Sequence, residues 1–142
     1  MKRIYVNEKW CLGCKLCEYN CAYANIGGKA MYLSLKDKII RPNIKIEEKG
    51  NVTYAVSCRH CKEPLCEKSC IAGAIHCENG VKEIDKSKCI GCYTCVLVCP
   101  YGALSISDSG VMQKCELCIT NSCGKPACVK GCPNGAIVFE ER

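Results

Sequence analysis

One run of cysteines, Cys89, Cys92, Cys95 and Cys99 followed by Pro100, constrains the fold of this chain more than any other feature. Two residues between successive cysteines allow a single tight turn to direct three thiolates at a common centre. The fourth cysteine follows after three more residues and points elsewhere, so it is free to reach a second centre. A chain built on such runs is expected to fold around bound metal, because metal binding and folding are coupled in small sites of this kind.

The pattern recurs along the chain, which makes internal repetition the basis of its organisation. The quartets are Cys11, Cys14, Cys17 and Cys21; Cys58, Cys61, Cys66 and Cys70; Cys89, Cys92, Cys95 and Cys99; and Cys115, Cys118, Cys128 and Cys132. The first has Ala22 in place of the proline, and the second has a longer gap before its third cysteine and Ile71 after its last. Of the 18 cysteines, only Cys77 and Cys123 stay outside the quartets.

The fourth quartet offers two candidates for its third member, Cys123 and Cys128. Cys123 reproduces the longer gap of the second quartet. Cys128 keeps the three-residue step to Cys132 that every other quartet has, and that step sets where the first three ligands pass to the fourth. We therefore expect Cys128 to bind metal and Cys123 to lie in the turn between Asn121 and Pro126.

The metal is expected to be iron in 4Fe-4S clusters, because three cysteines at two-residue intervals and a fourth after three more form the ligand pattern of bacterial iron-sulfur sites. Zinc sites instead pair two separated C-x2-C knuckles. Disulfides need an oxidising compartment and usually a secretory signal, whereas the ten residues before Cys11 contain no apolar run. The chain has no apolar stretch near 18 residues, so no membrane span is expected, and the predicted location is cytoplasmic.

The formal charge of +6 treats every cysteine as neutral. Four clusters would add roughly −8, since four thiolates contribute about −4 and each oxidised core about +2, which leaves the protein near −2. Nucleic acid is therefore not the expected partner. Six basic residues lie in or beside the quartets, where they either offset cluster charge, meet an acidic partner or are solvated: Lys15, Arg59, Lys62, Lys88, Lys114 and Lys130.

Short elements are expected between the quartets. After the fourth cysteine of three quartets, a helical turn should end at a glycine and lead into a short strand, in residues 70–75, 99–104 and 132–137. Hairpins are predicted over 75–84 around Asn79-Gly80, over 105–113, and over 44–56 around Lys49-Gly50-Asn51. A weak helix is predicted over 22–36. Arg3–Val6 alternates apolar and polar residues and could pair with Ile137–Glu140.

With these motifs in place, the chain resembles the four-cluster polyferredoxins that serve as electron-transfer subunits of molybdenum, tungsten, nickel-iron and CO-oxidising enzymes. It is most similar to the ferredoxin-like protein of anaerobic carbon monoxide dehydrogenases, through residues 1–7, 10–14, 58–61 and 138–142. The resemblance implies an α+β fold of tandem bacterial-ferredoxin-like units with short hairpins and helices. It implies one domain, 1–142, of two nested halves: an outer pair, 1–21 with 110–142, and an inner pair, 57–105, with a hairpin-containing insertion at 22–56.

The resemblance also implies how the quartets share their clusters. Each cluster takes three cysteines from one quartet and one from its partner quartet. The implied outer sets are Cys11, Cys14, Cys17 with Cys132, and Cys115, Cys118, Cys128 with Cys21; the inner sets are Cys58, Cys61, Cys66 with Cys99, and Cys89, Cys92, Cys95 with Cys70.

The implied function is electron transfer without catalysis. Electrons would pass between the catalytic subunit of carbon monoxide dehydrogenase and a flavin-dependent nicotinamide oxidoreductase, a hydrogenase or a ferredoxin. The alternatives are a subunit of an aldehyde, formate or other molybdenum or tungsten oxidoreductase, a free-standing soluble ferredoxin, and a redox or metal sensor. His60 could donate a hydrogen bond to a cluster sulfur or be exposed beside its turn. Trp10 and Tyr93 lie next to ligands and are expected to pack over the clusters.

Overall fold

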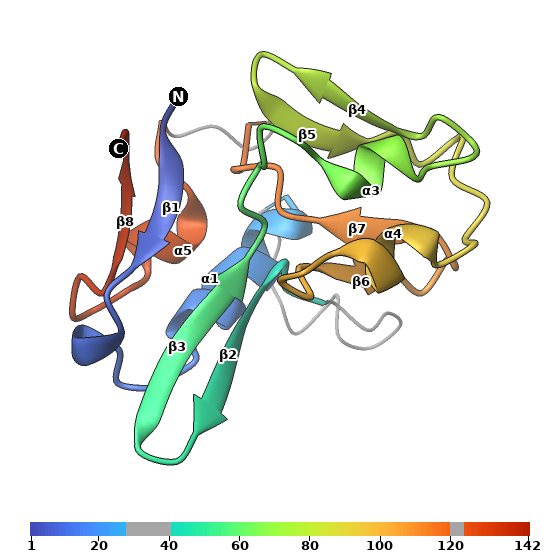
Figure 1. The fold of residues 1–142 in the computed structure, drawn as a ribbon. Coiled ribbons are helices and arrows are strands. Elements are labelled where there is room, and N and C mark those ends of the chain that lie inside the picture. The colour runs from blue at the N-terminus through green and yellow to red at the C-terminus, as the bar shows by residue number, and fades with distance from the viewer. Residues whose placement is uncertain (28–40, 120–123) are drawn as a thin grey trace.

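The structure, a computed structural model, describes residues 1–27, 41–119 and 124–142 (Figure 1). In these segments the strands form four antiparallel pairs: β1 (Arg3–Val6) with β8 (Ile137–Glu140), β2 (Ile44–Lys49) with β3 (Val52–Ser57), β4 (Ile75–Glu78) with β5 (Val81–Ile84), and β6 (Leu104–Ile106) with β7 (Met112–Lys114). The helices are α1 (Leu16–Asn25), α3 (Leu65–Lys68), α4 (Thr94–Val98) and α5 (Ala127–Lys130), with the 3-10 helix η1 (Glu8–Trp10). The predicted small α+β fold is confirmed.

Local turn chemistry accounts for three of the strand pairs. Asn79 and Gly80 have φ of 50° and 82°, the two left-handed positions that a two-residue hairpin loop between β4 and β5 requires. Gly50, with φ of 60°, turns β2 into β3, and Gly110, with φ of 80°, lies in the loop from β6 to β7. The three predicted hairpins are confirmed.

The fourth pair joins the two ends of the chain. β1 and β8 are antiparallel with Ile4 opposite Phe139, which confirms the predicted pairing. The Met1 ammonium forms an ion pair with the Glu141 carboxylate, and the termini lie side by side (Figure 1). This pairing brings the fourth quartet close to the first.

A single hydrogen-bonded turn follows the fourth cysteine of the last three quartets and ends at a glycine, as predicted. The short helices α3, α4 and α5, which precede that cysteine, were not predicted. In the third quartet the N–H of Gly102, whose φ is 59°, donates to the carbonyl of Cys99 at 3.3 Å. Cys99 is extended, with φ −76° and ψ 113°, because a following proline ring disfavours helical backbone. The predicted glycine and the strand after it are confirmed.

The helix predicted over 22–36 begins earlier, at Leu16, and ends at Asn25. It therefore carries Cys17 and Cys21, which are four residues apart and share one buried face. Residues 28–36 of the prediction lie outside the described residues. None of the described helices is long and apolar enough to cross a membrane.

Two clusters of buried side chains form the core, and cysteines belong to both. The first includes Ile4, Ile44, Val81 and Ile137 with Cys17, Cys21, Cys115 and Cys128, and the second includes Ile75, Ile84, Leu104 and Met112 with Cys95. Figure 1 shows β1, β8, α1, α5, β2 and β3 on one side and β4 to β7 with α3 and α4 on the other. Thiols thus occupy interior positions that hydrocarbon side chains fill in most folds.

Candidate iron-sulfur sites

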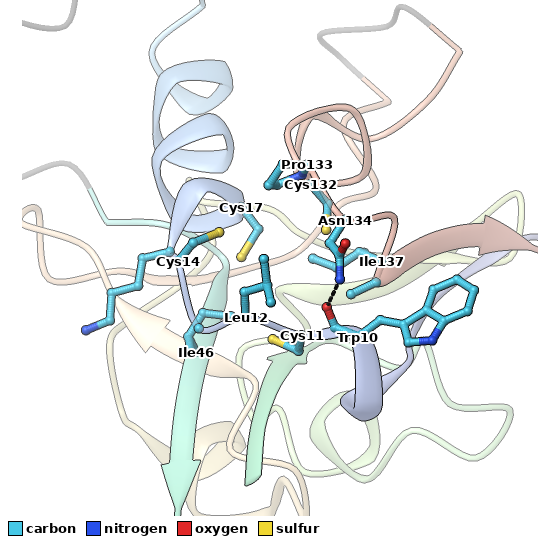
Figure 2. Close-up of a pocket in the computed structure, with 13 residues that line it drawn as sticks. Trp10, Cys11, Leu12, Cys14, Cys17, Ile46, Cys132, Pro133, Asn134 and Ile137 are labelled. Carbon is cyan, nitrogen blue, oxygen red and sulfur yellow. Dashed lines mark hydrogen bonds between the residues drawn. The ribbon is translucent and has the colours of Figure 1, made fainter. Parts of the chain in front are cut away.

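The first group of thiols, site 1, is a cavity lined by cysteines from both ends of the chain (Figure 2): Cys11, Cys14, Cys17 and Cys132. The first follows η1, the third lies on α1, and the fourth follows α5. The side-chain amide of Asn134 donates to the carbonyl of Trp10 at 2.7 Å and holds the two ends together beside the cavity (Figure 2). These four cysteines are the set that the resemblance assigns to one cluster.

Sites 3 and 4 are cavities formed by the second and third quartets. Site 3 is lined by Cys58, Cys61, Cys66 and Cys99, and site 4 by Cys70, Cys89, Cys92 and Cys95. Each cavity combines three cysteines of one quartet with the last cysteine of the other. At site 3 the side chain of Lys82 also lines the cavity, and the Arg59 guanidinium lies 5.6 Å from the ring centroid of Tyr101.

Sites 1 and 4 are built on the same left-handed turn. Gly13 and Gly91 precede the middle cysteine of their runs with φ of 67° and 68°, and Lys15 and Tyr93 follow it with φ of 60° and 62°. Glycine adopts this conformation without the steric cost that a Cβ imposes. At Gly91 a Cβ would lie 2.5 Å from the carbonyl oxygen of Gly110. The sequence repeat is therefore a repeat of backbone geometry.

Site 2 is the most deeply buried group: Cys21, Cys115, Cys118 and Cys128. Three of the four are buried, and these three belong to the first core cluster. Burial raises the pKa of Cys128, and the neighbouring thiols of Cys115, Cys21 and Cys118 raise it further. Cys123, the alternative third member of the fourth quartet, lies outside the described residues.

Burial holds these thiols in their protonated form when no metal is bound. It raises the pKa of Cys17, Cys21 and Cys95 to about 11 and that of Cys115 to about 12. A buried thiolate without a cation nearby is unfavourable, whereas a metal ligand is held as the thiolate. Iron binding would therefore release protons from the interior.

Backbone N–H groups point at thiol sulfurs in three of the sites. Such bonds favour the thiolate form and raise the potential of an attached cluster. The donors and acceptors are Asn43 N–H to Cys21 Sγ at 3.3 Å, His60 N–H to Cys58 Sγ at 3.4 Å, Ala74 N–H to Cys70 Sγ at 3.3 Å, Met112 N–H to Cys89 Sγ at 3.4 Å and Leu117 N–H to Cys115 Sγ at 3.4 Å. Four thiols per group, with N–H donors to the sulfurs in three of the groups, are a donor set that fits 4Fe-4S clusters.

The four sites follow one another in numerical order. The thiol of Cys17 in site 1 raises the pKa of Cys128 in site 2, and the thiol of Cys58 in site 3 raises the pKa of Cys115 in site 2. Site 2 therefore adjoins both site 1 and site 3. Cysteines of sites 3 and 4 pack against the same core cluster. The terminal sites each present an exposed cysteine, Cys14 in site 1 and Cys92 in site 4.

The basic residues beside the quartets divide by burial. Lys15, Arg59, Lys62, Lys88 and Lys130 are exposed, but Lys114 is only 1% exposed. The signal for this burial was present in the sequence, because Lys114 shares the inward-facing period-two positions of β7 with Met112.

His60 is 1% exposed, which excludes the surface position that was one of its two expected environments. Its Nδ1 accepts the backbone N–H of Lys82 at 3.1 Å, so the ring proton belongs on Nε2. Among the described residues Nε2 has no partner.

Other residues next to ligands are more exposed than predicted. Trp10 lines the cavity of site 1, as expected, but it is 56% exposed and Tyr93 is 49% exposed, so both rings also contact water. Cys77, on β4, is an exposed free thiol outside the four groups.

Known proteins are similar to this chain in sequence. The model of the 4Fe-4S dicluster domain matches residues 51–142, and that of the 4Fe-4S binding domain matches residues 8–24. An iron-sulfur protein of Rhodospirillum rubrum is 35% identical over 150 residues, covering 94% of this chain and 79% of that protein. The electron transport protein HydN of Escherichia coli (strain K12) is 31% identical over 155 residues, covering 98% and 87%.

A third relative is larger. UacF of Escherichia coli (strain K12), which is named as an oxidoreductase, is 36% identical over 127 residues, covering 89% of this chain. The chain spans only 19% of the length of that protein.

Proposed function

Because this chain belongs to the family of the 4Fe-4S dicluster domain, we propose that it relays electrons through four 4Fe-4S clusters between the catalytic subunit of a carbon monoxide dehydrogenase and a second redox partner. The family and the names of relatives matched over most of their length identify an iron-sulfur electron-transport protein. The number of clusters, their ligands and the two partners are the proposal. The second partner would be a flavoprotein oxidoreductase, a hydrogenase or a ferredoxin.

The observation that carries the proposal is the arrangement of 16 cysteines in four successive groups of four. Electron transfer weakens steeply with distance, so centres that each adjoin the next form a path through the protein. In this proposal each site holds one cluster, with Cys128 rather than Cys123 as the third member of the last quartet. Each bound cluster would supply a one-electron carrier.

The nesting of the quartets supports two ferredoxin-like halves within one domain. We assign sites 1 and 2 to the outer half and sites 3 and 4 to the inner half. The insertion at 22–56 would cover the outer half, because Ile46 of β2 lines site 1 and the Thr53 hydroxyl of β3 donates to the carbonyl of Cys11 at 2.8 Å. Its role is then to keep water from the outer sites.

The ends of the line are suited to partner contact. Leu12 beside site 1 is 68% exposed, and Ile90 and Leu97 beside site 4 are 66% and 84% exposed. Exposed apolar side chains around an exposed ligand favour a transient apolar contact that brings a partner's redox centre close. We propose that one partner binds at each end.

The first test is the metal content of anaerobically prepared protein. The proposal requires about 16 iron and 16 sulfide per chain and the broad visible absorption of 4Fe-4S centres. Two clusters per chain, or stoichiometric zinc, would contradict it.

The second test is reduction by the named partner. Catalytic amounts of carbon monoxide dehydrogenase should bleach the visible absorption in the presence of CO, and omission of CO should abolish the bleaching. The larger relative named as an oxidoreductase favours another possibility, in which this chain serves a different oxidoreductase. Rapid reduction by an aldehyde or formate oxidoreductase, without CO-dependent bleaching, would select that alternative.

A further inference from the structure

Lys114 is a buried lysine at the end of β7 whose charge has no carboxylate partner among the described residues. Its Nζ donates to the carbonyl of Lys82 and, at 3.3 Å, to the carbonyl of Cys115. An ammonium removed from water is unfavourable unless negative charge lies close to it. The charge of Lys114 opposes the rise that burial causes in the pKa of the half-buried Glu116 carboxyl, but the two residues form no ion pair. The close negative charge that would compensate the ammonium must therefore come from another source.

The position of Lys114 identifies that source. It immediately precedes Cys115 of site 2, and Lys82, whose carbonyl it binds, lines site 3. Burial raises the pKa of the Cys66 thiol of site 3, and the ammonium of Lys114 is the charge that opposes this shift most. The lysine therefore lies at the junction between sites 2 and 3.

Other cations at this junction are screened or paired. The ammonium of Lys82 lies 2.9 Å from the Glu67 carboxylate, which offsets its charge. Arg3 is partly exposed on β1, and the His60 ring accepts a hydrogen bond at Nδ1 and is neutral. Lys114 is thus the positive charge that acts here with the least screening.

Given the cluster sites of the proposed function, on which this inference rests, we propose that Lys114 raises the reduction potential of the clusters in sites 2 and 3, between which it lies. A cluster gains negative charge when it accepts an electron, and a nearby ammonium in a dry interior stabilises that reduced form. The middle of the line would then hold the electron, while the terminal sites exchange electrons with partners.

The test compares two neutral replacements with one charged replacement. Lys114→Met removes the charge and both hydrogen bonds, Lys114→Gln removes the charge but keeps an N–H donor, and Lys114→Arg keeps the charge. The matched control is Lys15→Met, which makes the same charge change beside site 1, where Lys15 is exposed to water. Reductive titration of the holoprotein, followed by electron paramagnetic resonance, measures each cluster.

We expect both neutral variants to lower the reduced-to-oxidised ratio of one cluster at least tenfold at a fixed potential, which equals about 59 mV for a one-electron centre. Lys114→Arg should stay close to the wild type, and Lys15→Met should change the site 1 cluster less than threefold. Four clusters with unchanged potentials in both neutral variants would overturn the inference. A shift in Lys114→Met alone would also overturn it, because hydrogen bonding rather than charge would be responsible.

Iron content is the measurement that decides the outcome when a variant fails to assemble all of its clusters. Loss of a cluster in both neutral variants, with 16 iron retained in Lys114→Arg, supports a requirement for the cation. Loss in all three variants overturns the inference, because the side chain would then act through packing. Fewer than four clusters in the wild type would instead overturn the proposed function.

Discussion

Replacing Gly91 with alanine should loosen site 4 through two separate costs. Gly91 has φ of 68°, a left-handed conformation that costs an alanine roughly 1–2 kcal/mol. In addition, the new Cβ would lie 2.5 Å from the carbonyl oxygen of Gly110 in the loop between β6 and β7. Both atoms belong to the backbone or are fixed to it, so the loop must move, at a further cost of about 1–3 kcal/mol.

Gly73→Ala is the matched control because it carries only the first cost. Gly73 has φ of 58° and lies three residues after Cys70, another cysteine of site 4, but a Cβ there meets no atom within 4 Å. The difference between the two variants therefore isolates the contact with Gly110.

The assay is the rate of iron release from site 4 to a chelator under anaerobic conditions at fixed temperature. Each 1.36 kcal/mol corresponds to a factor of ten, so Gly91→Ala should release iron about 5- to 150-fold faster than Gly73→Ala if opening the site relieves the contact. If Gly91→Ala prevents a cluster from assembling in site 4, the protein should contain about 12 iron instead of 16, which also indicates a weakened site. Equal iron content and equal release rates in the two variants would refute this reasoning.

Three further outcomes are expected. Cys128→Ser should lose or convert one cluster, whereas Cys123→Ser and Cys77→Ser should leave the iron content and the paramagnetic resonance spectrum unchanged; the opposite result for the first two would reassign the ligand. Burial, with the charges of nearby cations, lowers the pKa of His60 to about 3, so the fold is stabilised above pH 6.5 and loses up to about 1.4 kcal/mol per pH unit as the pH falls toward 3. His60→Gln should make chelator-driven cluster loss less dependent on pH over that range, and an unchanged pH profile would count against the buried neutral ring. Leu97→Glu should slow electron exchange with the partner that binds at site 4 while leaving all four potentials in place, and an unaltered rate would argue that this end is not a docking surface.

The hairpins were predictable because their determinants are local. Asn79-Gly80 selects a two-residue turn, and the alternation in Ile44 and Ile46 sets which side chains face inward. The turns after the fourth cysteines were predictable for the same local reason, because each ends at a left-handed glycine. The short helices before those cysteines were missed, because the cysteines there were treated only as ligands and not as helical residues.

The amino-acid sequence by itself indicated the chemistry of this protein: the cysteine quartets predict iron-sulfur sites, because ligand spacing is a property of a few consecutive residues. Only the tertiary structure decided which thiols share a cavity, since that depends on the pairing of β1 with β8 and of quartets far apart in the chain. It also decided that Lys114 and His60 are buried while Lys15 is exposed, although all three lie next to cysteines. Burial sets how strongly a charge acts on its neighbours, and burial comes from packing between distant segments.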